Sequence, residues 1–200
     1  MNIFSNDMRL LRAALSQRQI DVSCLLSDPS FNDNVNAKAE ALYSKGRDQR
    51  TLDQVTFDVT LGELGEYAIV NQLNACGIQT YHNVEQETLE FYWDVLVQGE
   101  HGLLKGEIKC QSDNVFDNTP KRYFSFSSSA KDELMRQKWQ SLDFVIAYTV
   151  QFSPTQTLVC PWLLIDPSAL NPQLNLYPKS IYNNGHYLRM DDSQNYFYYL

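Results

Sequence analysis

Four residues within one short stretch of the sequence could act together in a single chemical step: Asp94, Glu107, Lys109 and Gln111. They belong to two segments, 91–97 and 103–111, that are rich in aromatic and branched side chains. The segment between them, 98–102, is polar and contains two glycines, which is the pattern of a β-hairpin. Carboxylate oxygens can bind a hard cation, and a lysine can stabilise negative charge on a substrate. Whether these side chains lie close enough to act together depends on how the two segments pair.

The register of this hairpin sets which side chains meet. If Val97 pairs with Leu104, the same antiparallel register places Asp94 opposite Glu107. Lys109 then shares the face of Glu107, because side chains alternate along a strand. The resulting cluster of two carboxylates and a lysine is either the solvated face of an antiparallel sheet or a functional site.

A third carboxylate lies on a helix expected over residues 61–76. Thr60 and Glu63 have the spacing of a capping box, which gives Glu63 a structural role at the helix start. Glu66, one turn later, has no such role. Two glycines lie in the first turns of this helix: Gly62 and Gly65. Each costs about 1 kcal/mol relative to alanine, which indicates close approach of a strand or of a ligand backbone.

Together these residues resemble the PD-(D/E)XK nuclease superfamily. Asp94, twelve intervening residues and then Glu107-Ile108-Lys109 look like its core motif, and Gln111 stands where many members place a glutamine. Gly65-Glu66 matches the position of a helical glutamate in that superfamily. One departure is Trp93, which stands where the name-giving proline would precede Asp94. The resemblance covers residues 60–165.

The resemblance implies an α/β fold with a restriction-endonuclease-like core, in which helices flank a central mixed sheet of four to five strands. It also implies Mg²⁺, for which Mn²⁺ would substitute. The implied metal ligands are Asp94, Glu107, Glu66 and the Ile108 carbonyl, with Glu63 as the alternative to Glu66. By the same resemblance Lys109 orients a water or stabilises developing charge, and Gln111 contacts the water or the scissile phosphate.

The implied function is a Mg²⁺-dependent deoxyribonuclease that hydrolyses phosphodiester bonds, most simply as an endonuclease. Its partners would be DNA and, for cutting both strands of a duplex, a second copy of the chain. Five basic residues downstream of the hairpin are candidates for phosphate contacts or for a plain solvated surface: Lys121, Arg122, Lys131, Arg136 and Lys138. Restriction, repair, recombination and phage roles all remain open, as does RNA as the substrate.

Charge favours a different class of protein. The net charge is −8, and residues 1–100 hold seven Lys and Arg against fifteen Asp and Glu. Such a chain lacks the general basic footprint of a DNA-binding protein. The alternative function is therefore a catalytically silent binding or inhibitor module. It would keep the fold and use the acidic N-terminal half to mimic nucleic acid or to bind a basic protein partner.

The expected domain organisation is an N-terminal helical appendage over 1–55, followed by the nuclease-like domain over 56–200. The appendage is expected to contain helices at 5–18 and 35–44, with a loop at 28–34 between them. The other expected elements are edge strands at 78–83 and 158–165, strands at 122–126 and 143–150, a helix at 130–140 and an edge hairpin in 187–200.

Length and composition indicate the number of domains, the absence of a membrane segment and the cellular location. With 200 residues and 44% hydrophobic content, it is long enough for one domain with a sizeable core. It has no signal-peptide pattern and no run of about 18 apolar residues, which predicts no membrane segment. The four cysteines form no C-x-x-C pair, which predicts thiols, a cytoplasmic location and no zinc site.

Overall fold

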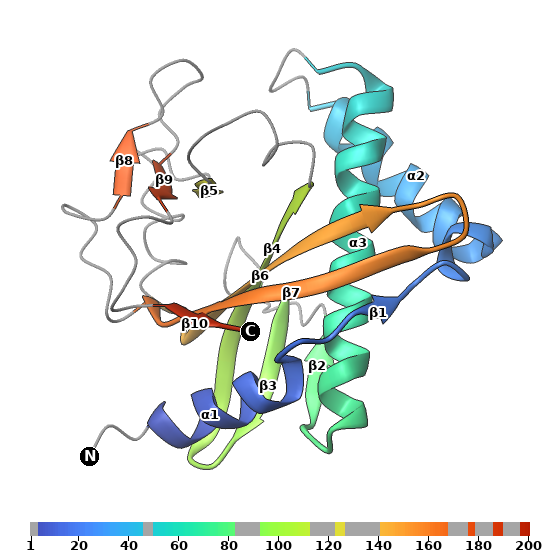
Figure 1. The fold of residues 1–200 in the computed structure, drawn as a ribbon. Coiled ribbons are helices and arrows are strands. Elements are labelled where there is room, and N and C mark those ends of the chain that lie inside the picture. The colour runs from blue at the N-terminus through green and yellow to red at the C-terminus, as the bar shows by residue number, and fades with distance from the viewer. Residues whose placement is uncertain are drawn as a thin grey trace.

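A strongly curled, mixed β-sheet forms the centre of the fold (Figure 1). The computed structural model describes residues 4–45, 50–82, 93–112, 123–126, 141–167, 176–178, 186–189 and 197–200. The sheet contains seven strands: β1 (Ile20–Asp21), β2 (Thr80–His82), β3 (Val95–Gly99), β4 (Gly102–Ser112), β6 (Phe144–Phe152), β7 (Thr157–Ile165) and β10 (Phe197–Tyr199). Their order is β1-β7-β6-β4-β3-β2, with β10 also paired to β7. The mixed α/β class is thus confirmed.

Strand directions follow from the connections. β2, β3 and β4 pair as antiparallel neighbours, whereas β4 and β6 are parallel and β7 returns antiparallel to β6. The expected strands at 78–83, 143–150 and 158–165 are confirmed as β2, β6 and β7, with β2 at one edge. The expected edge position of 158–165 is wrong, because β7 pairs with β6 on one side and with β1 and β10 on the other. The sheet has more than the expected four to five strands because β1 and β10 pair with the two ends of β7.

Pro161 lies on β7 between the parts that pair with β1 and β10. The pairing of β6 with β7 shifts register between Ala147 and Tyr148, so that Trp162 is bypassed beside the proline. Because proline cannot donate a ladder hydrogen bond, a strand tolerates it at such an irregularity, here also between the two stretches that pair with β1 and β10.

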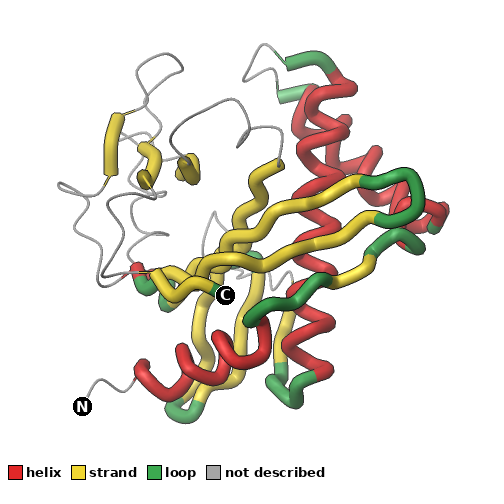
Figure 2. Tube along the Cα trace, in the orientation of Figure 1, coloured by secondary structure: helices red, strands yellow, loops and turns green. Residues whose placement is uncertain are grey.

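Within the described residues, three α-helices accompany the sheet: α1 (Phe4–Leu15), α2 (Pro29–Tyr43) and α3 (Leu52–Ala75), with a short 3₁₀ helix, η1 (Leu25–Ser27), before α2. The long α3 runs along one face of the sheet, behind the crossing strands β6 and β7 in Figure 2. Its buried apolar residues from Leu61 to Leu73 join those of α1 and the strands in one hydrophobic core. From α1 this core takes Met8, Leu11, Ala14 and Leu15. The division of the chain at residue 55 stays a prediction.

The expected start of the site helix is wrong. The helix begins at Leu52, not at residue 61, and its capping box is formed by Thr51 and Gln54. The Gln54 N–H donates to Thr51 Oγ1 at 3.3 Å, and the Thr51 N–H donates to Gln54 Oε1 at 2.8 Å. An ion pair of 2.6 Å between Arg50 and Asp58 also supports the added turns. The predicted structural role of Glu63 at the helix start is therefore wrong.

The expected loop at 28–34 is also wrong, because α2 begins there. Asp28 caps the helix by accepting a 2.8 Å hydrogen bond from the Ser30 N–H. Pro29 occupies the first helical position, where its missing N–H costs nothing. The sequence Asp-Pro-Ser thus starts a helix here and does not form a turn.

The remaining strands form a second, three-stranded antiparallel sheet in the order β5-β9-β8. Its strands are β5 (Tyr123–Phe126), β8 (Leu176–Pro178) and β9 (His186–Arg189). β5 confirms the strand expected at 122–126. The hairpin expected in 187–200 is wrong, since β9 pairs in this sheet and β10 pairs with β7. The helix expected at 130–140 lies outside the described residues.

Across the described ranges, none of the helices combines the length and the apolar character that crossing a membrane requires. All four cysteines are thiols.

Candidate active site

The β3–β4 hairpin has the expected register. Val97 pairs with Leu104 and Val95 with Gly106, which puts Asp94 across from Glu107 at the end of the hairpin far from its turn. The Asp94 N–H donates to the Gly106 carbonyl at 3.1 Å. Its side chain also reaches β4, since Oδ2 accepts a 2.7 Å hydrogen bond from the Ile108 N–H. Both the backbone N–H and the side chain of Asp94 are therefore hydrogen-bonded to β4, which fixes the position of one carboxylate oxygen.

Glu107 and Lys109 form an ion pair on the same face of β4. Glu107 is buried, and 29% of the Lys109 side chain is exposed. Burial alone would lower the pKa of Lys109, and it is the largest single influence on it. The charges of Glu107, Asp94 and Glu66 and the hydrogen bond to Glu107 outweigh it, so the Lys109 pKa is raised. Lys109 is thus an ammonium, not a base, at neutral pH.

The raised pKa of Lys109 reflects the charges of three carboxylates: Asp94 directly before β3, Glu107 on β4 and Glu66 on α3. Glu66 is half-buried on α3 and is the weakest of the three influences. Within the described residues, no group of three or more His, Cys, Asp or Glu side chains converges closely enough to hold a metal ion. The structure brings Asp94, Glu107 and Lys109 together, then, and Glu66 contributes through its charge.

Glu63, the alternative helical carboxylate, is engaged elsewhere. Its Oε1 pairs with Lys38 Nζ at 2.7 Å, and its Oε2 accepts a 3.2 Å hydrogen bond from Asn34 Nδ2. Both partners lie on α2, so Glu63 joins α2 to α3. Of the two candidate glutamates, only Glu66 acts on Lys109.

Gly65, the residue before Glu66, is needed for close packing. A Cβ on Gly65 would stand 1.8 Å from Cζ of Tyr148 on β6. The Tyr148 hydroxyl passes α3 at this point and donates to the Leu61 carbonyl at 2.7 Å. The expected close approach of a strand is thus confirmed at Gly65, but it is wrong at Gly62, where a Cβ would have no neighbour within 4 Å.

Tyr148 is a site neighbour that sequence reasoning missed. It is fully buried, and its pKa is raised well above the usual tyrosine value. Burial is the main cause, followed by the charge of Cys110 and a hydrogen bond with it, and then by the charges of Glu66 and Asp94. Its position within an almost continuously apolar segment gave no signal of contact with the helix.

A second missed group supports the hairpin on the face of Asp94. Lys105 Nζ lies 4.7 Å from the centroid of the Trp93 ring, a cation–π contact. The Trp93 Nε1–H donates to Ser141 Oγ at 3.1 Å, and the Lys105 N–H donates to Asp143 Oδ2 at 2.8 Å. Trp93, at the position of the name-giving proline, thus ties the start of β3 to the segment before β6.

Several expected site residues stay predictions. The backbone of Gln111 belongs to β4, paired with Thr149 of β6, but its side chain lies outside the described residues. The five expected phosphate-binding residues also lie outside them: Lys121, Arg122, Lys131, Arg136 and Lys138.

No protein-family model, curated protein or solved structure matches this chain.

Proposed function

We propose that the chain is a Mg²⁺-dependent nuclease that hydrolyses phosphodiester bonds of DNA as an endonuclease, on a restriction-endonuclease-like core. The observation that carries the proposal is the hairpin register, which gathers Asp94, Glu107 and Lys109 at one end of β3–β4. The arrangement of α3, the β2-β3-β4 meander and a β6 parallel to β4 supports the proposed core.

The carboxylates present can bind Mg²⁺, but their existing contacts limit how many of their oxygens do so. Mg²⁺ uses one or two carboxylates and keeps several waters, and Asp94 and Glu107 offer such a pair of hard oxygen ligands. One oxygen of each is already engaged, with the Ile108 N–H and with Lys109. The fit is therefore to a two-carboxylate site completed by water and substrate, with the Ile108 carbonyl and Glu66 as further proposed contributors.

A bound Mg²⁺ would supply Lewis-acid stabilisation and a more acidic water. The protein's own contribution begins with Asp94, whose hydrogen bond to β4 keeps its carboxylate oriented. Lys109 is held protonated by its acidic neighbours, so it donates hydrogen bonds to a phosphate oxygen and stabilises the negative charge on it. It does so by exchanging its contact with Glu107 for one with the substrate. Gln111, beyond it on β4, would hold the attacking water or the phosphate.

A single assay with a matched variant tests this function. Supercoiled plasmid and single-stranded DNA are incubated with the protein in Mg²⁺, Mn²⁺ or EDTA, alongside Glu107→Gln, which keeps the side-chain shape and removes the charge. We expect metal-dependent nicking by the wild type and a rate on the order of 100-fold lower for the variant, with circular dichroism unchanged. Equal rates for both proteins would contradict the site.

The acidic composition favours the second candidate function, a silent binding module. The charge of −8 and the fifteen acidic residues in the first hundred suit a basic protein partner better than DNA. In that case the wild type leaves every DNA form intact and is retained by a basic partner at low salt. DNA cleavage that depends on Glu107 excludes it.

A further inference from the structure

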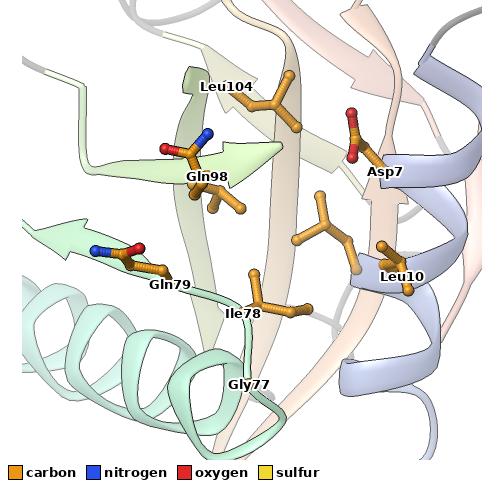
Figure 3. Close-up of a pocket in the computed structure, with 9 residues that line it drawn as sticks. Asp7, Leu10, Gly77, Ile78, Gln79, Gln98 and Leu104 are labelled. Atoms are coloured by element: carbon orange, nitrogen blue, oxygen red, sulfur yellow. The ribbon is translucent and has the colours of Figure 1, made fainter. Parts of the chain in front are cut away.

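A small pocket lies beside the turn of the β3–β4 hairpin (Figure 3). It encloses about 270 Å³ and is formed by α1, the segment between α3 and β2, and the two hairpin strands. Its lining includes none of the candidate active-site residues. Four of its lining side chains are apolar and wholly or partly buried: Leu11, Ile78, Val97 and Leu104.

Asp7 is the charged group of this pocket. It is only 6% exposed, and its Oδ1 accepts a 3.1 Å hydrogen bond from the Glu100 N–H. No lysine, arginine or histidine in the described ranges forms an ion pair with it. Aspartate is almost never this buried unless it is paired, because a buried charge is costly without a partner. Among the residues that the structure describes, no side-chain cation therefore pairs with this carboxylate.

The Asp7 side chain lines the pocket. Gly99 lies close against it, since a Cβ there would stand only 2.9 Å from Asp7 Oδ2. In Figure 3, Asp7 and Leu10 of α1 face Ile78, Gln98 and Leu104 from across the pocket. Gln98 is exposed and Leu10 is 59% exposed, so the rim is open to solvent.

We propose that this pocket binds a small amphipathic cation. Its ammonium or guanidinium group pairs with Asp7, and its apolar body packs against Leu11, Ile78 and Leu104. The volume is slightly below the roughly 300–1,000 Å³ of ordinary ligand pockets, so the ligand is small. A net charge of −8 also raises the local concentration of cations over that of neutral or anionic compounds.

A purely structural role for Asp7 makes a different prediction. In that role the carboxylate only anchors the hairpin turn to α1 through the Glu100 N–H. Asp7→Asn keeps an acceptor oxygen for that bond and removes the charge. The substitution therefore separates anchoring, which survives, from cation binding, which does not.

The test is a calorimetric titration of the full chain with benzylammonium and butylguanidinium, with uncharged benzyl alcohol as the control probe. We expect saturable binding of the cations with dissociation constants on the order of 1 mM, as suits ligands of this size. Asp7→Asn should weaken binding at least tenfold, and the backbone amide signals of Ile78 and Gln98 should shift only with the cations.

A second variant keeps the proposal testable if Asp7→Asn does not fold. Leu10→Lys changes an exposed residue one turn after Asp7 and supplies an internal ammonium at helical spacing. It should also abolish binding. The proposal is overturned if the wild type binds neither cation at about ten times the expected dissociation constant. It is also overturned if benzyl alcohol binds as well as the cations, or if both variants bind the cations like the wild type. Because the pocket excludes the candidate active site, these outcomes are independent of any nuclease activity.

Discussion

The two faces of the β3–β4 hairpin do different work. Val95, Leu104 and Ile108 face α3 and belong to the hydrophobic core. The opposite face carries Asp94, Glu107 and Lys109, whose charges act on one another. One strand pair thus supplies stability on one face and a charged constellation on the other, because side chains alternate with a period of two. Substitutions on the two faces should therefore separate stability from activity.

The largest effect on stability is expected from truncation on the core face. Ile108→Ala removes buried side-chain volume while leaving the Ile108 N–H bond to Asp94 in place. It should lower the free energy of unfolding by about 2–5 kcal/mol, measured by urea denaturation. Ile108→Val, the graded control, should lower it by about 0.5–1.5 kcal/mol. Nuclease activity, measured well below the melting temperature, should persist in both variants. Its loss in the valine variant would contradict the separation of stability and activity between the two faces.

Two glycines on α3 extend the comparison to the helix that covers the core face. Gly65→Ala forces a Cβ into the Tyr148 ring and should cost about 1–3 kcal/mol in the free energy of unfolding. Gly62→Ala meets no neighbouring atom and should stabilise the helix by about 0.5–1 kcal/mol. The same sign for both changes, measured by thermal and urea denaturation, would contradict the tight contact at Gly65.

A smaller effect is expected from pH on the charged face. The Lys109 pKa is raised in the folded state, so its contribution to stability is full below the unfolded lysine pKa of about 10.4 and is lost as pH rises through the folded value. Tyr148, whose pKa is also raised, acts in the same direction. Lys109→Met should therefore make the alkaline loss of stability shallower than in the wild type. Parallel unfolding profiles from pH 8 to pH 12 would show that the charged face does not hold this proton.

The hairpin could be predicted because its signals are local. The polar, glycine-containing turn between two apolar segments sets the pairing of Val97 with Leu104, and alternation then places Asp94 across from Glu107. The buried strand β6 could likewise be predicted from its almost continuously apolar sequence. In each case the deciding residues lie within a few positions of one another.

The misjudged helix starts show where local signals compete. Thr51 with Gln54 and Thr60 with Glu63 both have capping-box spacing, but only the first pair caps the helix. Burial of Val55 and the Arg50–Asp58 ion pair keep the turns before residue 61 helical.

The role of Glu63 was beyond prediction for another reason. Its partner Lys38 is 25 residues away and reaches it only once α2 packs on α3. Likewise, Tyr148 meets Gly65 across more than eighty residues. Such contacts depend on tertiary packing, which no local pattern encodes.

The most direct test of the charged face is the nicking rate of Lys109→Met beside Lys105→Met in Mg²⁺. The two lysines lie on the same face of β4, four residues apart, but Lys105 contacts the Trp93 ring and not the carboxylate pair. The account predicts a rate about 100- to 1,000-fold below wild type for Lys109→Met and a rate near wild type for Lys105→Met, with both proteins folded. Equal rates for the two variants, or a wild type that cuts no form of DNA, would contradict it.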